Sequence, residues 1–298
     1  MQPPVPGAGS ANVRPTGMLS SYIPYWEQLI PLGRGDYIHF KTYNSGSTDF
    51  REFVVAMDGS LVRALPINMK VILSDQLGSQ IFLALQKNIS PINGPNGGSQ
   101  FQDAMIINVT TGKEISIPSI GEPFFTKNSS QIIGIQQEPD GQWQPVGIRL
   151  EDGQAALFCP EAKGSFVRIQ EMQDNHYLIS AFDEQNQALN IYTFSSGTCV
   201  KRNAFPSQKP YDVKAIFNGD FTKLVLQIMI KEKNYTDTQA IYVPLDGKPP
   251  LKITSPVFLG AGLLKIKFIN NDQSIWFMGN QTHPSEFNAY LWHLPKGL

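Results

Sequence analysis

The stretch AIYVPLDGKPPLKITSP, residues 240–256, has the pattern of a β-hairpin followed by a stop. Two runs rich in apolar and β-branched residues flank Asp246-Gly247, a pair that readily adopts the positive φ angles of a tight turn. Pro256 has no N–H to donate to a strand ladder, so we expect the second strand to end there. The stretch therefore predicts two short antiparallel strands.

The same hairpin pattern recurs along the chain, and each copy carries a glycine at its turn. Copies end at Pro66, Pro118, Pro160 and Pro206, and a last one, AYLWHLPKGL, occupies residues 289–298. The turn glycines are Gly59, Gly112, Gly153, Gly197, Gly247 and Gly297. A spacing of roughly 40–50 residues is the period of a β-propeller blade.

Two further strand-like runs precede each hairpin, for example YDVKAIF and KLVLQIMI before the opening stretch. Each repeat thus reads as four short strands, and no helical periodicity of useful length competes with this pattern. We predict an all-β fold, a six-bladed β-propeller with four antiparallel strands per blade.

The sixth repeat lacks its fourth strand, because only Leu298 follows Gly297. An unpaired strand edge invites aggregation, so a ring needs another segment there. We expect residues 13–24 to supply this strand and to close the last blade. The predicted organisation is an N-terminal extension with the ring-closing strand at 1–24, and a single six-bladed propeller domain at 25–298.

The fifth and sixth repeats resemble the TolB-type propeller repeats that also occur in dipeptidyl-peptidase-like and prolyl-oligopeptidase-like enzymes. The likeness lies in IYVPLDGKPPLKITSP at 241–256 and FINNDQSIWFMG at 268–279. In those peptidases a separate α/β-hydrolase domain carries the Ser/His/Asp triad, and this sequence has no G-x-S-x-G motif. The resemblance therefore implies the fold and leaves the function open.

The charge balance limits the kinds of partner. The 298 residues include 24 basic and 25 acidic ones, a net charge of -1, which argues against nucleic-acid binding through bulk charge. Charged residues make up only 16% of the chain, so the polar surface relies on Asn, Gln, Ser and Thr, as in many exported proteins. No apolar run approaches the ~20 residues of a membrane span. We expect a periplasmic or secreted protein; a cytoplasmic location is the alternative, because residues 1–17 contain no signal-peptide core.

The sequence offers no convergent set of catalytic residues or metal ligands. The four histidines fall in different repeats, and His39 and His293 alternate with aromatic residues on strands, as packing residues do. A hard cation takes six to eight oxygen ligands, and the inner strands offer only Asp75, Glu171, Asn218 and Asn270. We predict no catalytic residue, no cofactor and no required metal.

The two cysteines, Cys159 and Cys199, fall at the end and the start of outer strands in adjacent blades. Such positions lie near opposite faces of the propeller disc. We expect their Cα atoms to be farther apart than the ~7 Å limit for a disulfide, which predicts two free thiols.

One alignment between repeats suggests a binding site. The innermost strands read MKVI, VRIQ, VKAI and LKIK, which places a basic residue at an equivalent position in each: Lys70, Arg168, Lys214 and Lys265. Because innermost strands line the channel, these side chains would form a basic collar at one mouth that receives an acidic segment or a carboxylate. The alternative is that they reach solvent or pair with neighbouring acids.

We therefore predict a non-enzymatic propeller scaffold, or protein-binding domain, that presents one face and the channel mouth to a protein partner. Neither nucleic acid nor a membrane-spanning role is expected. The alternatives are a hydrolase or lyase with its active site in the channel, and an extracellular adhesion or glycan-binding module that exposes Trp26 or Trp143. The loops at 86–103 and 230–239 are expected on the same face of the disc.

Overall fold

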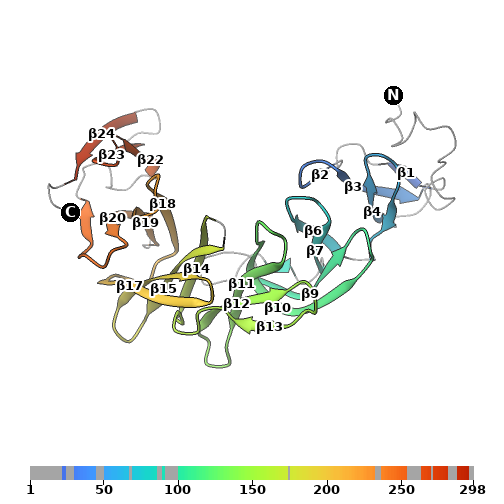
Figure 1. Cartoon of the computed structure of the whole chain (residues 1–298), viewed down its shortest axis with the longest axis horizontal. Coiled ribbons are helices and arrows are strands. Elements are labelled where there is room, and N and C mark those ends of the chain that lie inside the picture. The colour runs from blue at the N-terminus through green and yellow to red at the C-terminus, as the bar shows by residue number, and fades with distance from the viewer. Residues whose placement is uncertain are drawn as a thin grey trace. The chain divides into compact units, whose positions relative to one another are not determined.

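The computed structural model describes residues 22–24, 30–44, 50–66, 69–85, 89–90, 100–173, 175–231, 236–253, 263–269, 271–280 and 287–294. The chain divides into two compact bodies, which are described separately. The N-terminal body comprises residues 1–90, 99–133 and 148–155, and the C-terminal body comprises residues 91–98, 134–147 and 156–298. Across the described ranges the chain forms strands and turns, and no helix (Figure 1).

The strands pair in five antiparallel sheets. The first contains β1 (Tyr22–Pro24), β2 (Ile30–Leu32), β3 (Tyr37–Asn44), β4 (Phe50–Ala56) and β5 (Val62–Ala64). The second contains β6 (Met69–Ser74), β7 (Gln80–Leu85), β8 (Ile89–Ser90), β9 (Gln100–Asn108), β10 (Glu114–Phe125), β11 (Gln131–Gln137), β12 (Trp143–Arg149) and β13 (Ala155–Leu157).

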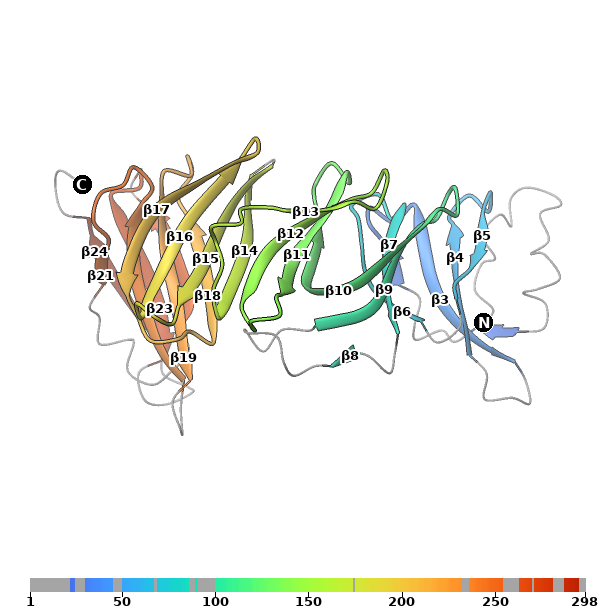
Figure 2. The same cartoon turned by 90° about the horizontal axis from the view of Figure 1, so that it is seen from below.

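The other three sheets belong to the C-terminal body, and each follows the chain order of its strands. The third sheet contains β14 (Phe166–Gln173), β15 (His176–Asp183), β16 (Ala188–Ser195) and β17 (Thr198–Pro206), seen side by side in Figure 2. The fourth contains β18 (Asp212–Phe217), β19 (Lys223–Lys231), β20 (Thr236–Pro244) and β21 (Leu251–Ile253). The fifth contains β22 (Leu263–Ile269), β23 (Ser274–Asn280) and β24 (Phe287–His293).

The second sheet joins two of the repeats that the sequence separates. Pro118 was expected to end a strand, yet it lies inside β10, where the pairs Ile117↔Ala104 and Ser119↔Gln102 continue on either side of it. The missing N–H removes one ladder bond without breaking the strand. Because β10 is continuous from the end of one repeat into the start of the next, the described strands form five sheets, and six separate blades stay a prediction.

The described part of the N-terminal extension pairs with the first sheet. β1 pairs antiparallel with β3, Tyr22 opposite Asn44 and Pro24 opposite Thr42. β2 pairs with the other half of the same strand, so β1 and β2 together form one interrupted inner strand. The first sheet therefore includes residues 22–24, and the expected domain boundary at residue 25 stays a prediction. Residues 13–21 lie outside the described ranges, and closure of the ring stays a prediction.

The hairpin turns form as the sequence predicts. The turn glycines at 59, 112, 153, 197 and 247 have φ angles between 74° and 88°, the left-handed region that side chains with a Cβ disfavour. Gly297 lies outside the described residues.

The core of the C-terminal body lies between facing sheets. Along β19, Leu224 and Leu226 pack toward the third sheet, whereas Val225 packs toward the fifth. Successive side chains of a strand point to opposite faces, so a strand that is covered on both faces is apolar at most positions. This explains the run LVLQIMI at 224–230, which is apolar except for Gln227 and which an alternating one-sided strand would not have. In the N-terminal body, Leu32 and Val54 of the first sheet pack with Ile81 and Leu83 of the second.

Candidate functional site

The inner strands of the three sheets of the C-terminal body are neighbours, β14 next to β18 and β18 next to β22. Arg168, Lys214 and Lys265 are each the third residue of their strand, so these three collar residues occupy equivalent positions on adjacent sheets. Lys70 lies on β6, in the N-terminal body, and its place relative to the other three is not defined.

The collar residues differ in their surroundings. Lys70, Lys214 and Lys265 are exposed, whereas Arg168 is half-buried and its Nε lies 3.7 Å from Oδ1 of Asp212 on β18. Arg168 thus pairs with a neighbouring acid, as the alternative interpretation expects. Lys214 and Lys265 are the two collar residues of this body whose exposure suits contact with a partner.

A larger concave site lies at the other end of the same inner strands. A groove of about 600 Å³ separates the last residues of β14 and β16 from the turns that follow β18 and β20. Its apolar wall is formed by Met172 and Phe194 of the third sheet and by Phe221 and Leu245 of the fourth. These side chains are half-buried or buried, and the rings of Phe194 and Phe221 belong to aromatic contacts that fix their positions.

Positive charge exceeds negative charge on the rim of the groove. Arg202, Lys223 and Lys248 line it together with two carboxylates, Asp220 and Asp246. Nε of Arg202 donates a hydrogen bond to Oγ1 of Thr193, 2.7 Å away, which orients the guanidinium and leaves its terminal nitrogens at an exposed position.

Both carboxylates of the rim are already hydrogen-bonded within their own turns. Asp220 accepts bonds from the hydroxyl and the N–H of Thr222, and these bonds lower the pKa of its carboxyl. Asp246 accepts a bond from the N–H of Lys248, the main reason that its pKa is lowered. The groove is therefore rich in donors for an incoming ligand and poor in free acceptors.

Tyr242 lines the groove and is fully buried, with 0% of its surface exposed. Within the described ranges its hydroxyl has no hydrogen-bond partner. Burial raises the pKa of this phenol, and the charge of Asp246 on the rim raises it further. The ring of Tyr242 packs toward the fifth sheet, against Phe277 and Trp292. A buried hydroxyl without a partner costs about 1–3 kcal/mol of stability.

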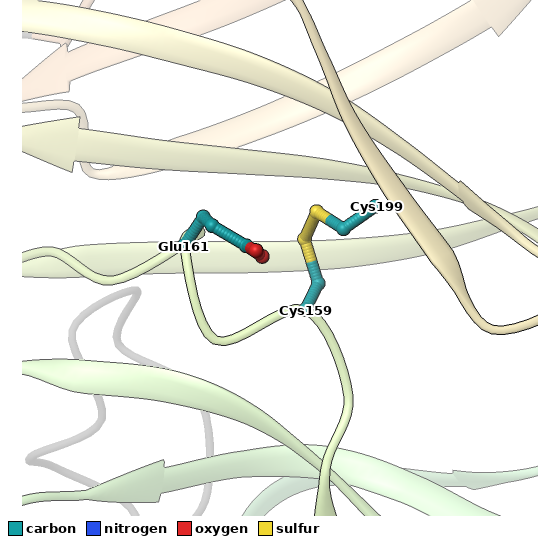
Figure 3. Close-up of side chains that lie close together, drawn as sticks. All are labelled: Cys159, Glu161 and Cys199. Atoms are coloured by element: carbon teal, nitrogen blue, oxygen red, sulfur yellow. A yellow bond between two sulfur atoms is a disulfide. The ribbon is translucent and has the colours of Figure 1, made fainter.

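The prediction of two free thiols is wrong. Cys159 and Cys199 form a disulfide, and their Cα atoms are 5.3 Å apart (Figure 3). β13 ends at Leu157, and Cys159 lies in the turn beyond it with a φ of +110°, so its side chain is not at the end of an outer strand. The disulfide joins this turn to the start of β17.

The other polar residues considered from the sequence have structural partners. Asp75 accepts bonds from the hydroxyl of Ser79 and the N–H of Gln80, which closes the β6–β7 turn. Asn218 donates to Asp272, a link between the fourth and fifth sheets. Asn270 lies outside the described residues.

The histidines are not brought together. His39 is 6% exposed and lies 3.0 Å from Oε2 of Glu52, which fits a packing role. His293 is exposed rather than half-buried, and its Nδ1 lies 2.9 Å from Oγ of Ser274. His176 is on the rim of the groove, opposite Ser195 on β16. His283 lies outside the described residues.

Trp143 is 3% exposed, so it is not the surface aromatic side chain that a glycan-binding module would use. Trp26, most of the loop at 86–103, and residues 232–235 lie outside the described ranges, and the rest of the expected loop at 230–239 belongs to β19 and β20. The groove itself had no signal in the sequence: its walls come from residues about 30–70 positions apart that meet only when two sheets pack.

No protein-family model matches the chain, and no curated protein matches it. Among solved structures, the β-propeller domain of the Trilobed protease from Pyrococcus furiosus matches with 13% identity and a TM-score of 0.44, over 91% of this chain and 82% of that chain. The acylaminoacyl peptidase of Pyrococcus horikoshii matches with 11% identity and a TM-score of 0.43, over 94% of this chain but 47% of that chain. TolB from Acinetobacter baumannii matches with 12% identity and a TM-score of 0.38, over 89% of this chain and 62% of that chain.

These matches confirm the predicted resemblance to TolB-type and peptidase propellers, and they concern the fold alone. This chain spans less than half of the acylaminoacyl peptidase, and no activity, partner or residue role is transferred from any of these proteins. The class defined by fold and topology is an all-β protein of serial antiparallel sheets, with propellers as its structural neighbours. Among the described residues, no helix is both long and apolar enough to cross a bilayer.

Proposed function

We propose that this chain is a non-enzymatic propeller-type scaffold that binds a protein partner, and that the groove of the C-terminal body holds a segment of that partner with both acidic and apolar side chains. The observation that carries the proposal is the apolar wall of the groove beside the exposed guanidinium of Arg202, which Thr193 orients.

The chemistry of the groove selects this ligand. Phe194 and Phe221 offer an apolar surface for a side chain such as Phe or Leu. Arg202 supplies charge-assisted hydrogen bonds, which suit a carboxylate better than a neutral amide. The carboxylates of Asp220 and Asp246 are occupied by their own turns, so repulsion of an acidic ligand is limited.

The collar residues provide a second contact in this proposal. Lys214 and Lys265 lie near the start of their inner strands, whereas the groove lies beyond the ends of β14 and β18, so the two sites are at opposite ends of those strands. A partner segment with acidic residues would be held at the collar by charge, and with little apolar contact.

The proposed location is an oxidising compartment, periplasmic or extracellular. Disulfides persist in such compartments and are rare in the cytosol, and the bond between Cys159 and Cys199 supports this choice over the cytoplasmic alternative.

A hydrolase is the competing function, and one feature favours it: His176 and Ser195 form a cross-strand pair on the rim of the groove. A general base beside a hydroxyl is the arrangement that acyl transfer uses. Incubation of the chain with activated esters and with peptides distinguishes the two functions. Turnover that is lost in His176→Gln would replace the scaffold by a hydrolase.

The test of the binding function uses short fluorescent peptides that combine Asp or Glu with Phe or Leu, and the same peptides with Asn or Gln in place of the acids. Anisotropy is expected to show binding of the acidic series and much weaker binding of the amide series. Arg202→Gln should weaken binding of the acidic series roughly tenfold or more, since a hydrogen bond to a charged group contributes about 1.5–3 kcal/mol.

Arg149→Gln is the matched control, because Arg149 is an exposed arginine that pairs with Asp152 outside the groove. Its affinity for the acidic peptides should equal that of the wild type. Equal binding of the two peptide series, no binding of either, or an unchanged affinity in Arg202→Gln would each overturn the proposal.

A further inference from the structure

Three groups with metal-binding chemistry meet at one point of the C-terminal body. The sulfurs of Cys159 and Cys199 and a carboxylate oxygen of Glu161 all lie within 4.8 Å of one another. Figure 3 shows the Glu161 carboxylate directed toward the disulfide. We propose that reduction of this disulfide converts the cluster into a Zn²⁺ site, with two thiolates and one carboxylate as its ligands. This inference is independent of the function proposed for the groove.

The backbone already holds the ligands near the required spacing. Zn–S bonds of 2.3 Å in a tetrahedral site place two sulfurs about 3.8 Å apart, farther than in a disulfide, so the sulfurs need to separate after reduction. The Cα atoms are 5.3 Å apart, and rotation of the two side chains suffices for this separation. The backbone of the turn that carries Cys159 and Glu161 can therefore keep its position beside β17.

The site is built from two segments of the chain, which gives the metal a structural effect. Cys159 and Glu161 lie two residues apart in the turn after β13, and Cys199 is the second residue of β17. Either the disulfide or a bound ion would hold the turn against the strand. Reduction without a metal would release it.

Access and surroundings suit an ion at this position. Cys159 is 1% exposed, Cys199 is half-buried and Glu161 is exposed, so an ion would enter from the side of the carboxylate and meet the buried sulfur last. A water molecule on the open side would complete four-coordination. Two thiolates select Zn²⁺ over Mg²⁺ and Ca²⁺, which prefer oxygen ligands.

Each step balances with a phosphine as the reductant. The phosphine takes the oxygen atom of one water molecule and becomes a phosphine oxide. The S–S bond breaks, and each sulfur receives one of the two hydrogens of that water, which gives two thiols. Zn²⁺ then forms two Zn–S bonds and displaces the two thiol protons to solvent.

The experiment uses the full chain, reduced with a phosphine that is then removed without air. Co²⁺ serves as a spectroscopic substitute, because thiolate ligands give it an intense near-ultraviolet charge-transfer band, and Zn²⁺ is measured by competition with a chromophoric chelator. We expect one equivalent of metal in the reduced protein and none in the oxidised protein. Cys199→Ser should remove the charge-transfer band, and Glu161→Gln should weaken Zn²⁺ binding about tenfold or more.

Glu151→Gln is the control, an exposed glutamate in the turn before β13 that should leave metal binding unchanged. A second measurement keeps the test valid if reduction partly unfolds the chain. The urea midpoint of the reduced chain should rise when Zn²⁺ is added, and that of the oxidised chain should not. A reduced chain that takes up no Co²⁺ and gains no stability from Zn²⁺ would overturn the site. Equal Zn²⁺ affinity in Glu161→Gln would remove Glu161 from it.

Discussion

The ring of Phe158 packs against the ring of Phe194, with centroids 4.1 Å apart. Phe158 is the neighbour of Cys159 in the chain, and Phe194 pairs with Cys199 across β16 and β17 and lines the groove. The disulfide and the wall of the groove thus share one aromatic contact. A change at the disulfide is therefore expected to reach the groove.

Cys199→Ser should lower the free energy of unfolding by about 2–4 kcal/mol, because the disulfide closes a loop with a sequence separation of 40 residues in the unfolded chain. Urea unfolding measures this loss. Addition of a reductant should bring the wild type to the midpoint of the variant and leave the variant itself unchanged. A wild-type urea midpoint that does not change when the reductant is added would contradict the stabilising role of the disulfide.

Tyr242→Phe separates stability from binding. Removal of a buried hydroxyl without a partner should leave the free energy of unfolding unchanged or raise it by up to about 1–3 kcal/mol. The same variant should bind the acidic peptides as the wild type does, because the ring packs toward the fifth sheet and not toward the third-sheet wall of the groove. A loss of stability would show that the hydroxyl has a hydrogen-bond partner in solution, and weaker binding would show that it reaches the ligand.

Gln170 joins two sheets through one side chain. Its amide nitrogen donates to the carbonyl of Ala215 at 2.7 Å, and its amide oxygen accepts from the N–H of Ala215 at 2.9 Å. Gln170→Ala leaves both backbone groups without this partner and should cost about 1–3 kcal/mol in urea unfolding. Gln185→Ala, at an exposed turn position of the same sheet, should change stability by less than about 0.5 kcal/mol. Equal effects would mean that solvent replaces both bonds.

Gly164 lies where two segments approach closely. A Cβ at this position would be 2.3 Å from the carbonyl oxygen of Phe182, a backbone atom that cannot move aside. Gly164→Ala should destabilise the fold by about 1–3 kcal/mol or more. Gly219→Ala is the matched control, since its Cβ would meet nothing within 4 Å, and thermal unfolding of the two variants decides the point.

Much of the fold is legible in the sequence because it follows from local rules. Asp246-Gly247 favours a tight turn, and the run LVLQIMI of β19, apolar except for Gln227, favours a sheet on each side. These two signals locate β19, β20 and β21 of the fourth sheet. The joining of two repeats through β10 was missed because Pro118 reads locally as a stop, and only pairing on both sides of it shows otherwise.

The site was less predictable than the fold, because it depends on contacts between sheets. The disulfide was missed because Cys159 lies in the turn beyond Leu157, with a positive φ, and not at the end of the strand. The groove was missed because Arg202 of β17 and Lys223 of β19 come to line one groove only when the third and fourth sheets pack together. The equivalence of Lys214 and Lys265, by contrast, follows from the repeat, and both lie at the third position of adjacent inner strands.

Tyr177 predicts how stability depends on alkaline pH. Burial, and secondly the charge of Glu171, raise the pKa of its phenol to about 12, compared with about 10 in an unfolded chain. The folded state therefore holds this proton after the unfolded state has lost it. Stability from Tyr177 is fully present below about pH 10 and is lost as the pH rises through 12, by at most about 2–3 kcal/mol.

Urea unfolding of the wild type and of Tyr177→Phe at pH 9 and at about pH 12 isolates this loss, because lysine titration is common to both proteins. The wild type should lose more stability than the variant between the two pH values. The remaining alkaline sensitivity of the variant is expected from Tyr192 and Tyr242, whose phenol pKa values are also raised by burial. Parallel losses in the two proteins would mean that water reaches the Tyr177 hydroxyl, and that its 2% exposure understates the access of solvent in solution.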